Sequence, residues 1–166
     1  MHDRVVGTEP LAECLRKGLL HRAVAVLVLR SSGAVLLQQR SKADLWQPGL
    51  WTLSCTGHIR SGEAYRAAAA RELQEELGLR STLQARGKFS LPPFTDGKLT
   101  EHEWVALFTT KTDAQVAIDP VELESVREVS VSQLREIVSG GLLTQDAKIL
   151  LGEYLSAEAR QKPRSS

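Results

Sequence analysis

Several features that would assign a chain to a special class of protein are scarce in this sequence. Among its 166 residues are two cysteines, Cys14 and Cys55, which form neither a CxxC pair nor a disulfide framework. The longest apolar run, 23–29, is seven residues, whereas a membrane-spanning helix needs about 20. Residues 1–10 contain no apolar segment of the kind found in secretory signals. These absences favour a cytoplasmic protein that does not insert into membranes.

A large excess of charge of one sign is also lacking. The 21 Lys and Arg residues nearly balance the 20 Asp and Glu residues, which leaves a net charge of +1. This balance argues against a protein that binds nucleic acid polymers or membrane surfaces through bulk charge. The length suits one domain with a buried core. We expect a single domain over 1–160 and a flexible basic tail over 161–166.

The order of apolar runs and turn signals predicts a chain of mixed α and β structure. Strands are expected where apolar residues form short or alternating runs bounded by Gly, Pro or Asp. Helices are expected where helix formers continue without Gly or Pro, with Ser132 as N-cap of the second helix and Gly140 ending it. The expected strands are 22–29, 34–40, 51–56, 83–89, 103–110 and 126–131, and the expected helices are 64–77, 132–138 and 144 or 145 to about 159.

The most informative segment lies inside the expected helix 64–77, where residues 71–76 read Arg-Glu-Leu-Gln-Glu-Glu. Glu72, Glu75 and Glu76 are related by i, i+3 and i, i+4 and therefore share one helix face. Carboxylates gathered on one face repel one another unless a cation lies between them. A hard divalent ion such as Mg²⁺ or Mn²⁺ takes oxygen ligands and commonly bridges them to phosphate. The alternative is a solvated acidic stripe on a surface helix.

The residues flanking this segment favour the metal site. Gly57 precedes Glu63 by six positions, Arg71 follows eight positions later, and Gly78 stands where a glycine C-cap ends a helix. With the glutamates, they match Gly-x5-Glu-x7-Arg-Glu-U-x-Glu-Glu-x-Gly-U, where U is aliphatic, at all nine fixed positions. This pattern is the Nudix box, and the chain resembles the Nudix superfamily. The resemblance implies an α/β/α sandwich with a mixed central β-sheet.

The resemblance also implies a role for each residue of the box. In Nudix hydrolases the divalent ions are bound by the carboxylates that fall here on Glu72, Glu75 and Glu76. The first of them often orients or deprotonates the attacking water, and the glycine matching Gly57 often donates its carbonyl to the metal. The residues matching Glu63 and Arg71 support the loop and aim the catalytic carboxylates. The expected reaction is Mg²⁺-dependent or Mn²⁺-dependent cleavage of a diphosphate bond.

A second resemblance, to the type I isopentenyl-diphosphate isomerases, extends beyond the box. That family shares the Nudix fold but moves a proton instead of cleaving a diphosphate. The segments that carry the likeness are 20–23, 36–40, 48–52 and 54–58. The family's metal site uses histidines and a Glu-x-Glu pair, and the matching residues here are His21, His58, Glu101 and Glu103. They form a possible second metal site; the alternative is that the histidines are polar pocket residues and the glutamates an exposed strand edge.

Departures from the isomerase pattern favour hydrolysis. The isomerase's catalytic cysteine comes directly before its Gly-His, where this chain has Thr56. Cys55 is one position earlier, and on a strand it would face the opposite side. The family's proton-relay tyrosine falls near Leu91, and no tryptophan follows Trp104 to match its C-terminal one. An early metal histidine of the family falls at Cys14.

Substrate-binding residues are expected in loops such as 41–50 and 90–100. Arg40 is a candidate for a bidentate phosphate clamp, with a solvated strand-end arginine as the alternative. Isomerases have a diphosphate-binding lysine where this chain has Asp44, which leaves Lys42 as a substitute. Trp46 and Trp51 are candidates to stack on a base, although tryptophans beside a Pro-Gly turn are as often packing anchors.

Three functions remain open on the sequence, and each has a small-molecule diphosphate as partner. The favoured one is a Nudix hydrolase that cleaves a nucleoside diphosphate derivative or a related organic diphosphate. The second is an isopentenyl-diphosphate isomerase with altered acid and base residues. The third is a non-catalytic diphosphate sensor, although a sensor has no need of all three glutamates. The sequence leaves the substrate and the oligomeric state undetermined.

Overall fold

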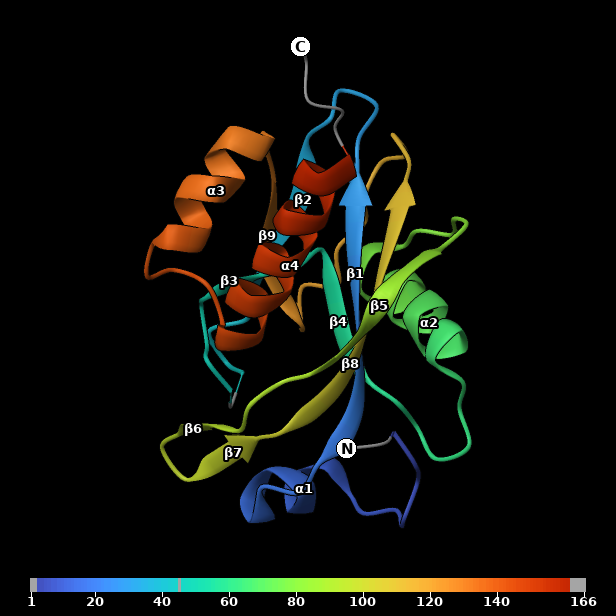
Figure 1. The fold of residues 1–166 in the computed structure, drawn as a ribbon, viewed down its shortest axis with the longest axis vertical. Coiled ribbons are helices and arrows are strands. Elements are labelled where there is room, and N and C mark those ends of the chain that lie inside the picture. Colours follow the sequence, from blue (N-terminus) through green and yellow to red (C-terminus); the bar gives the residue numbers. More distant parts are fainter. Residues whose placement is uncertain (1–2, 45, 162–166) are drawn as a thin grey trace.

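A mixed β-sheet with helices on both faces forms the body of the computed structural model, which describes residues 3–44 and 46–161 (Figure 1). Helices α3 and α4 lie on one face and α2 lies on the other, while α1 packs beside β7 at the lower end of the view. The expected α/β/α sandwich is therefore confirmed. The helices are α1 (Leu11–Lys17), α2 (Tyr65–Leu77), α3 (Val131–Ser139) and α4 (Gln145–Gln161). The strands are β1 (His21–Leu29), β2 (Val35–Arg40), β3 (Trp51–Thr52), β4 (Cys55–His58), β5 (Gln84–Ser90), β6 (Phe94–Asp96), β7 (Leu99–Glu101), β8 (Glu103–Lys111) and β9 (Leu123–Val129).

Strand β1 is the centre of the seven-stranded sheet. It pairs in parallel with β8 along its whole length, from His21 opposite Glu103 to Leu29 opposite Lys111. Its other edge is shared, because β4 pairs with its first half and β2 begins at its far end. Strands β9 and β3 extend the sheet from β2, and β5 extends it from β8. This pairing brings the starts of β1 and β8 next to the end of β4.

Alternation along β1 divides the interior into two cores. Ala23, Ala25 and Leu27 face a cluster that includes the apolar residues of α3 and α4, whereas Val24, Val26 and Val28 face α2. All six side chains are buried. A strand that is apolar on both faces requires a cover on each face, which is why the sheet carries helices on both sides.

The expected strand 51–56 is interrupted at Leu53 and Ser54. The buried Ser54 hydroxyl accepts a hydrogen bond from the Val28 amide at 2.7 Å and donates one to the Leu36 carbonyl at 2.5 Å. The side chain thereby satisfies backbone groups of β1 and β2 where the two strands diverge. The strand is consequently divided into β3, which pairs with β2, and β4, which pairs with β1.

Other boundaries also differ from expectation. Ser132 as the N-cap of α3 was wrong: Ser130 accepts from the Gln133 amide, and the Gln133 side chain accepts from the Ser130 amide, which forms a capping box. The last strand correspondingly runs from 123 to 129. Helix α1, which was not expected, ends at Gly18 with a φ of 63°. Helix α4 extends to Gln161, the first residue of the expected tail, and residues 162–166 lie outside the described part.

We predict that Ser54→Ala lowers the free energy of unfolding by about 1–3 kcal/mol, because it leaves a buried amide and a buried carbonyl without their partner. Urea denaturation followed by circular dichroism measures the change. The exposed Ser90, at the end of β5, provides the control, and Ser90→Ala should stay within about 0.5 kcal/mol of the parent. Equal stability of both variants would contradict the bridging role of Ser54.

Candidate metal and diphosphate site

Helix α2 presents different residues to the core and to the candidate site. Leu73 and Leu77 are buried against the sheet, while Glu72, Glu75 and Glu76 all line a cavity. Glu72 and Glu76 are largely buried, whereas the side chain of Glu75 is 46% exposed. The helix ends as expected at Gly78, whose φ is 67° and whose amide donates to the Gln74 carbonyl. The helix therefore places the three glutamates together at the cavity wall.

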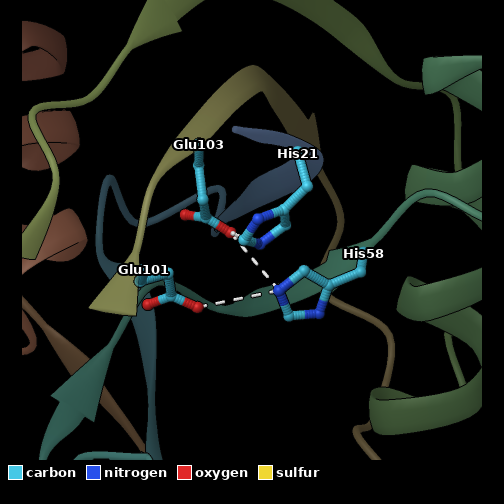
Figure 2. Close-up of side chains that lie close together, drawn as sticks. All are labelled: His21, His58, Glu101 and Glu103. Atoms are coloured by element: carbon cyan, nitrogen blue, oxygen red, sulfur yellow. Dashed lines mark ion pairs between the residues drawn. The ribbon is translucent and has the colours of Figure 1, made fainter. Parts of the chain in front are cut away.

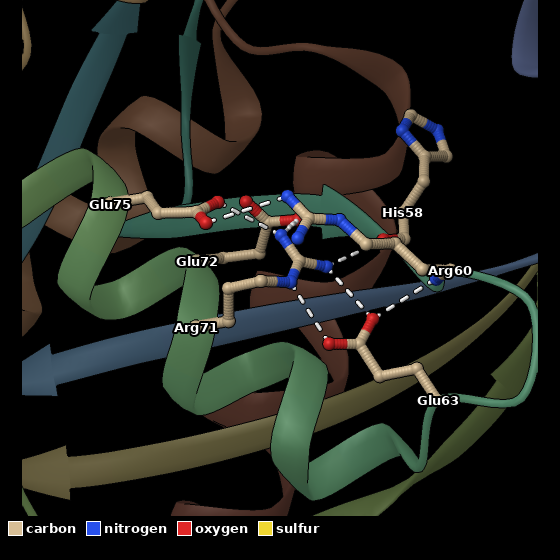
Figure 3. A network of polar contacts seen from close by, with 6 residues as sticks. All are labelled: His58, Arg60, Glu63, Arg71, Glu72 and Glu75. Atoms are coloured by element: carbon tan, nitrogen blue, oxygen red, sulfur yellow. Dashed lines mark hydrogen bonds and ion pairs between the residues drawn. The ribbon is translucent and has the colours of Figure 1, made fainter.

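Arg71 holds the box loop against α2 (Figure 3). Its Nε and Nη2 donate to the two carboxylate oxygens of Glu63, each at 2.9 Å. Its Nη1 donates to Glu72 at 2.6 Å and to Glu75 at 3.0 Å, and Nη2 also donates to the His58 carbonyl at 3.1 Å. The hydrogen bonds from Arg71 hold the pKa of Glu63 down at about 2. Since its guanidinium nitrogens are engaged by these partners, Arg71 has the geometry of a positioning residue.

Gly57 of β4 lies against the carboxyl group of Glu72. A Cβ placed on Gly57 would overlap the carboxyl group of Glu72. Any side chain at this position would therefore displace Glu72 from its contact with Arg71. The small residue lets the backbone of β4 approach the glutamates of α2. The Gly57 backbone therefore lies beside Glu72, and the carbonyl ligand that the resemblance implies stays a prediction.

The electrostatics of Glu72 and Glu76 favour a bound cation. Burial raises the pKa of Glu72, although the contact with Arg71 opposes this shift. Burial raises the pKa of Glu76 well above its usual value, and the charges of Glu72 and Glu122 raise it further. Within the described chain, the buried Oε2 of Glu76 has no hydrogen-bond partner. Carboxylates that are crowded and incompletely paired fit a divalent ion, which would neutralise them.

A second group of ligand-type side chains lies at the starts of β1 and β8 and the ends of β4 and β7 (Figure 2). His21, His58, Glu101 and Glu103 each offer an atom, and these atoms all lie within 4.8 Å of one another. Glu103 Oε1 lies 3.4 Å from His58 Nε2 and 3.6 Å from His21 Nε2, while Glu101 Oε1 lies 3.6 Å from His58 Nε2. The structure thus brings together all four residues expected from the sequence.

The four side chains fit a transition metal ion. The Nδ1 of His21 lies 2.9 Å from the Leu19 carbonyl, so a proton on Nδ1 leaves Nε2 free to ligate. In the described chain the buried Nε2 atoms of His21 and His58 have no hydrogen-bond partner. Burial lowers the pKa of His21. Burial acts in the same direction on His58, but the Glu101 and Glu103 carboxylates outweigh it and raise the pKa to about 10.

One cavity of about 990 Å³ joins the two groups of residues. Its lining includes the box glutamates, Arg71, Gly57 and the His and Glu residues of the second group. Leu11, Ala12, Cys14 and Leu15 of α1 close part of its wall. A cavity of this size accommodates a molecule as large as a nucleotide. Both groups of metal-ligand candidates therefore open onto the same cavity.

The positions that would carry isomerase chemistry have other properties here. Thr56 lines the cavity, whereas Cys55 is wholly buried in the core beneath α2, as expected for a residue on the opposite face of the strand. Burial raises the pKa of the Cys55 thiol well above its usual value, which makes it a poor nucleophile or base. Leu91 belongs to the core between the sheet and α4. Cys14 lines the cavity but lies outside the group of four metal-ligand candidates.

The four residues expected to bind substrate have separate positions. Arg40 lines the cavity, but its guanidinium donates to Asp44 at 2.6 Å and to the Trp46 carbonyl at 2.9 Å. Trp46 also lines the cavity and contacts Phe94 edge to face at 6.0 Å between ring centroids. Lys42 and Trp51 do not belong to the cavity lining in the described chain. Lys42 is exposed, and Trp51 packs against the core with Arg127 above its ring.

Arg60, Glu122 and Asp146 are among the charged residues that line the cavity without having been expected. Arg60 lies 3.4 Å from Glu75, Glu122 precedes β9 near Glu76, and Asp146 lies in the first turn of α4. Arg60 lies inside the box, but at a position where the motif accepts any residue. Glu122 and Asp146 reach the cavity only through the pairing of β9 with β2 and the packing of α4. No local sequence signal marks these two.

Comparison with known proteins identifies the family. Residues 19–150 match the model of the NUDIX domain. The chain is 37% identical over 134 residues to an isopentenyl-diphosphate Delta-isomerase of Serratia proteamaculans, covering 81% of this chain and 75% of that protein. It is 33% identical over 140 residues to an uncharacterized Nudix hydrolase of Pseudomonas aeruginosa. The aligned residues cover 81% of this chain and 80% of that protein. The structure resembles that of a MutT protein from Methanosarcina mazei, with a TM-score of 0.69, 22% identity and coverage of 86% and 96%.

The chain therefore belongs to the Nudix superfamily. Several further relatives of similar identity also bear the isomerase name, so the relatives favour the isomerase alternative over the hydrolase expected first. The family and the cavity together indicate a small diphosphate as ligand. In the described part of the chain, every helix is too short or too polar to cross a bilayer.

We predict that transition-metal affinity at the second group rises with pH from about 6 to 9. With its pKa raised to about 10, His58 is protonated in the metal-free protein and must lose a proton on binding. Titration of Mn²⁺ or Zn²⁺ by calorimetry in buffers of different ionisation enthalpy measures the proton release. His58→Ala should weaken binding and reduce this release.

His102→Ala is the matched control, because His102 lies between Glu101 and Glu103 in sequence but outside the group of four. It should bind the metal with nearly the parent affinity. If His21→Ala/His58→Ala retains the parent's transition-metal content after dialysis, these residues only line the pocket.

Proposed function

We propose that this protein is a metal-dependent hydrolase that cleaves a diphosphate bond in a nucleoside diphosphate derivative or a related organic diphosphate. The observation that carries the proposal is the buried pair Glu72 and Glu76 at the cavity wall, with raised pKa values and Gly57 pressed against Glu72. A diphosphate carries several negative charges, so these carboxylates would repel it if no cation lay between them. When bound, Mg²⁺ or Mn²⁺ would supply the charge that neutralises both.

The chain's own residues then have distinct tasks. Glu72, Glu75 and Glu76 would hold the divalent ion, and Glu72 would orient the attacking water. Arg71 fixes the direction of Glu72 through the 2.6 Å hydrogen bond and is itself fixed by Glu63. Arg60 is 65% exposed at the cavity and pairs with Glu75 at 3.4 Å, whereas Arg40 is held by Asp44 at 2.6 Å. Arg60 is therefore the better candidate to turn to a phosphate oxygen. An aimed water in a fixed electrostatic environment is what diphosphate hydrolysis requires.

Isomerisation of isopentenyl diphosphate is the second candidate. The isomerase relatives favour it, as does Glu103, because burial raises the pKa of its carboxyl group and makes it a better proton donor than an exposed glutamate near neutral pH. Isomerisation also needs a second group that transfers a proton. In the isomerases this group is a cysteine, and this chain has Thr56 at the matching position. A threonine hydroxyl is a much weaker acid than a thiol, so the residues at the cavity support hydrolysis better.

We predict that Glu76→Gln and Glu72→Gln each lower kcat for diphosphate cleavage on the order of 10²-fold or more, because each loses a charged oxygen ligand. The assay measures phosphate released with Mg²⁺ present from nucleoside diphosphates and prenyl diphosphates. For nucleotide sugars it measures phosphate released from the two monophosphate products by added phosphatase. Glu153→Gln, on the exposed face of α4, is the control and should keep the parent rate. Near-normal turnover in both box variants would refute the assigned site.

The two candidate reactions are separated by isotope exchange. Isopentenyl diphosphate incubated with the parent protein and Mg²⁺ in D₂O should acquire no deuterium and form no dimethylallyl diphosphate, because Thr56 cannot act as the thiol does. Mass spectrometry and proton NMR measure both outcomes. Deuterium incorporation that is lost in Glu103→Gln would establish isomerisation instead of hydrolysis.

A further inference from the structure

Two buried side-chain oxygens in the cavity wall have no hydrogen-bond partner in the described part of the chain. One is Oε2 of Glu76 on α2, and the other is Oε1 of Gln38 on β2. Both residues line the cavity, where Glu76 is 4% exposed and Gln38 is 2% exposed. While Glu76 is ionised, both atoms are acceptors, so neither can satisfy the other. A donor or a cation is needed to pair them.

The alternation along β2 directs Gln38 toward α2. Leu36 belongs to the core cluster that contains Leu73 and Leu77 of α2, and residues two apart on a strand share a face. Strand β2 pairs with β3 on one edge and with β9 on the other at Gln38, so its backbone is fixed there. Burial raises the pKa of Glu76, and the Gln38 amide opposes this shift as a hydrogen-bond donor. The two side chains are therefore neighbours across the cavity wall.

The next residue on the strand, Gln39, has the partners that Gln38 lacks. Its Nε2 donates to the Gly49 carbonyl at 3.0 Å, and its Oε1 accepts from the Ser125 hydroxyl at 3.0 Å. Gln39 is absent from the cavity lining in the described residues. A buried polar atom is unfavourable unless it is paired, and most such atoms in proteins have a partner. The unpaired oxygen of Gln38 is therefore a feature of the cavity side of β2, and it points to a ligand.

A divalent ion fits both oxygens, because hard cations accept carboxylate and amide oxygens alike. The acidic residues of α2 already crowd negative charge at this wall, and Glu72 raises the pKa of Glu76 further. Another carboxylate would add to that repulsion, whereas an amide oxygen adds a ligand without adding charge. Gln38 has this property and lies outside the Nudix box.

We propose that Gln38 is a metal-binding residue that supplies an uncharged oxygen to the divalent ion held by Glu76. The inference rests on one part of the proposed function, the binding of the ion by the glutamates of α2. It does not depend on which diphosphate is cleaved.

Titration with Mn²⁺ alone, in which electron paramagnetic resonance measures the free ion, tests the assignment. All variants are made in the His21→Ala/His58→Ala background, so that the second group of ligands does not contribute. Gln38→Leu should weaken Mn²⁺ binding on the order of 10-fold or more. Gln38→Glu keeps an oxygen at this position and should bind at least as tightly as the background protein. Gln39→Leu is the matched control and should stay within about 2-fold.

Stability without metal separates a metal-binding role from a structural one. Gln38→Leu removes an unpaired oxygen from the interior, so its urea midpoint without metal should equal or exceed that of the background protein. Added Mn²⁺ should then raise the midpoint less than it does in the background protein, since the ion binds more weakly. A side chain that only supports the fold would give a lower midpoint without metal and an unchanged Mn²⁺ affinity.

The outcomes distinguish this inference from the proposed function. If Gln38→Leu binds Mn²⁺ as tightly as the background protein, the role of Gln38 is overturned, and a water molecule is what pairs with its oxygen. If Glu76→Gln also leaves Mn²⁺ binding unchanged, the metal site of the proposed function is overturned together with it. If Gln38→Leu weakens binding but the parent cleaves no diphosphate, hydrolysis fails and the role of Gln38 stands.

Discussion

The bidentate salt bridge between Arg71 and Glu63 is the interaction on which the rest of the candidate site depends. It joins the loop after β4 to helix α2, and the same guanidinium then reaches Glu72, Glu75 and the His58 carbonyl. An ammonium group could not serve so many partners, because its donors do not form a planar fork. The contact also explains how several carboxylates can lie close together before any cation binds.

The remaining constraint is that negative charge is concentrated along one cavity. Glu72 and Glu76 gather at one end, Glu101 and Glu103 at the other, and burial raises the pKa of Glu76 and of Glu103. These carboxylates repel one another when no cation is present, so a bound cation stabilises the arrangement. At the second group, His58 supplies the charge itself, since the two carboxylates hold it protonated. Metal binding and proton release are therefore coupled there.

The kinship with isomerases and the chemistry of the cavity point to different reactions. Three of the relatives that bear the isomerase name are 35–37% identical to this chain over the aligned residues. A change of reaction within such a scaffold needs only a few side chains, because the fold positions the diphosphate and the side chains around it determine the reaction. Thr56 in the cavity and Cys55 in the core illustrate this, since adjacent residues on β4 face opposite sides of the sheet.

The sequence by itself determined the parts of this protein that depend on local spacing. The i, i+3 and i, i+4 relations place Glu72, Glu75 and Glu76 on one face of α2, and Gly78 ends that helix, because a helix repeats every 3.6 residues in any fold. The likeness to a known family supplied His21, His58, Glu101 and Glu103. Only the tertiary structure decided that Asp44 binds the guanidinium of Arg40, that Trp51 packs away from the cavity, and that Asp146 lines the cavity. These outcomes depend on contacts between segments far apart in the chain, and neither periodicity nor spacing encodes which of those segments meet.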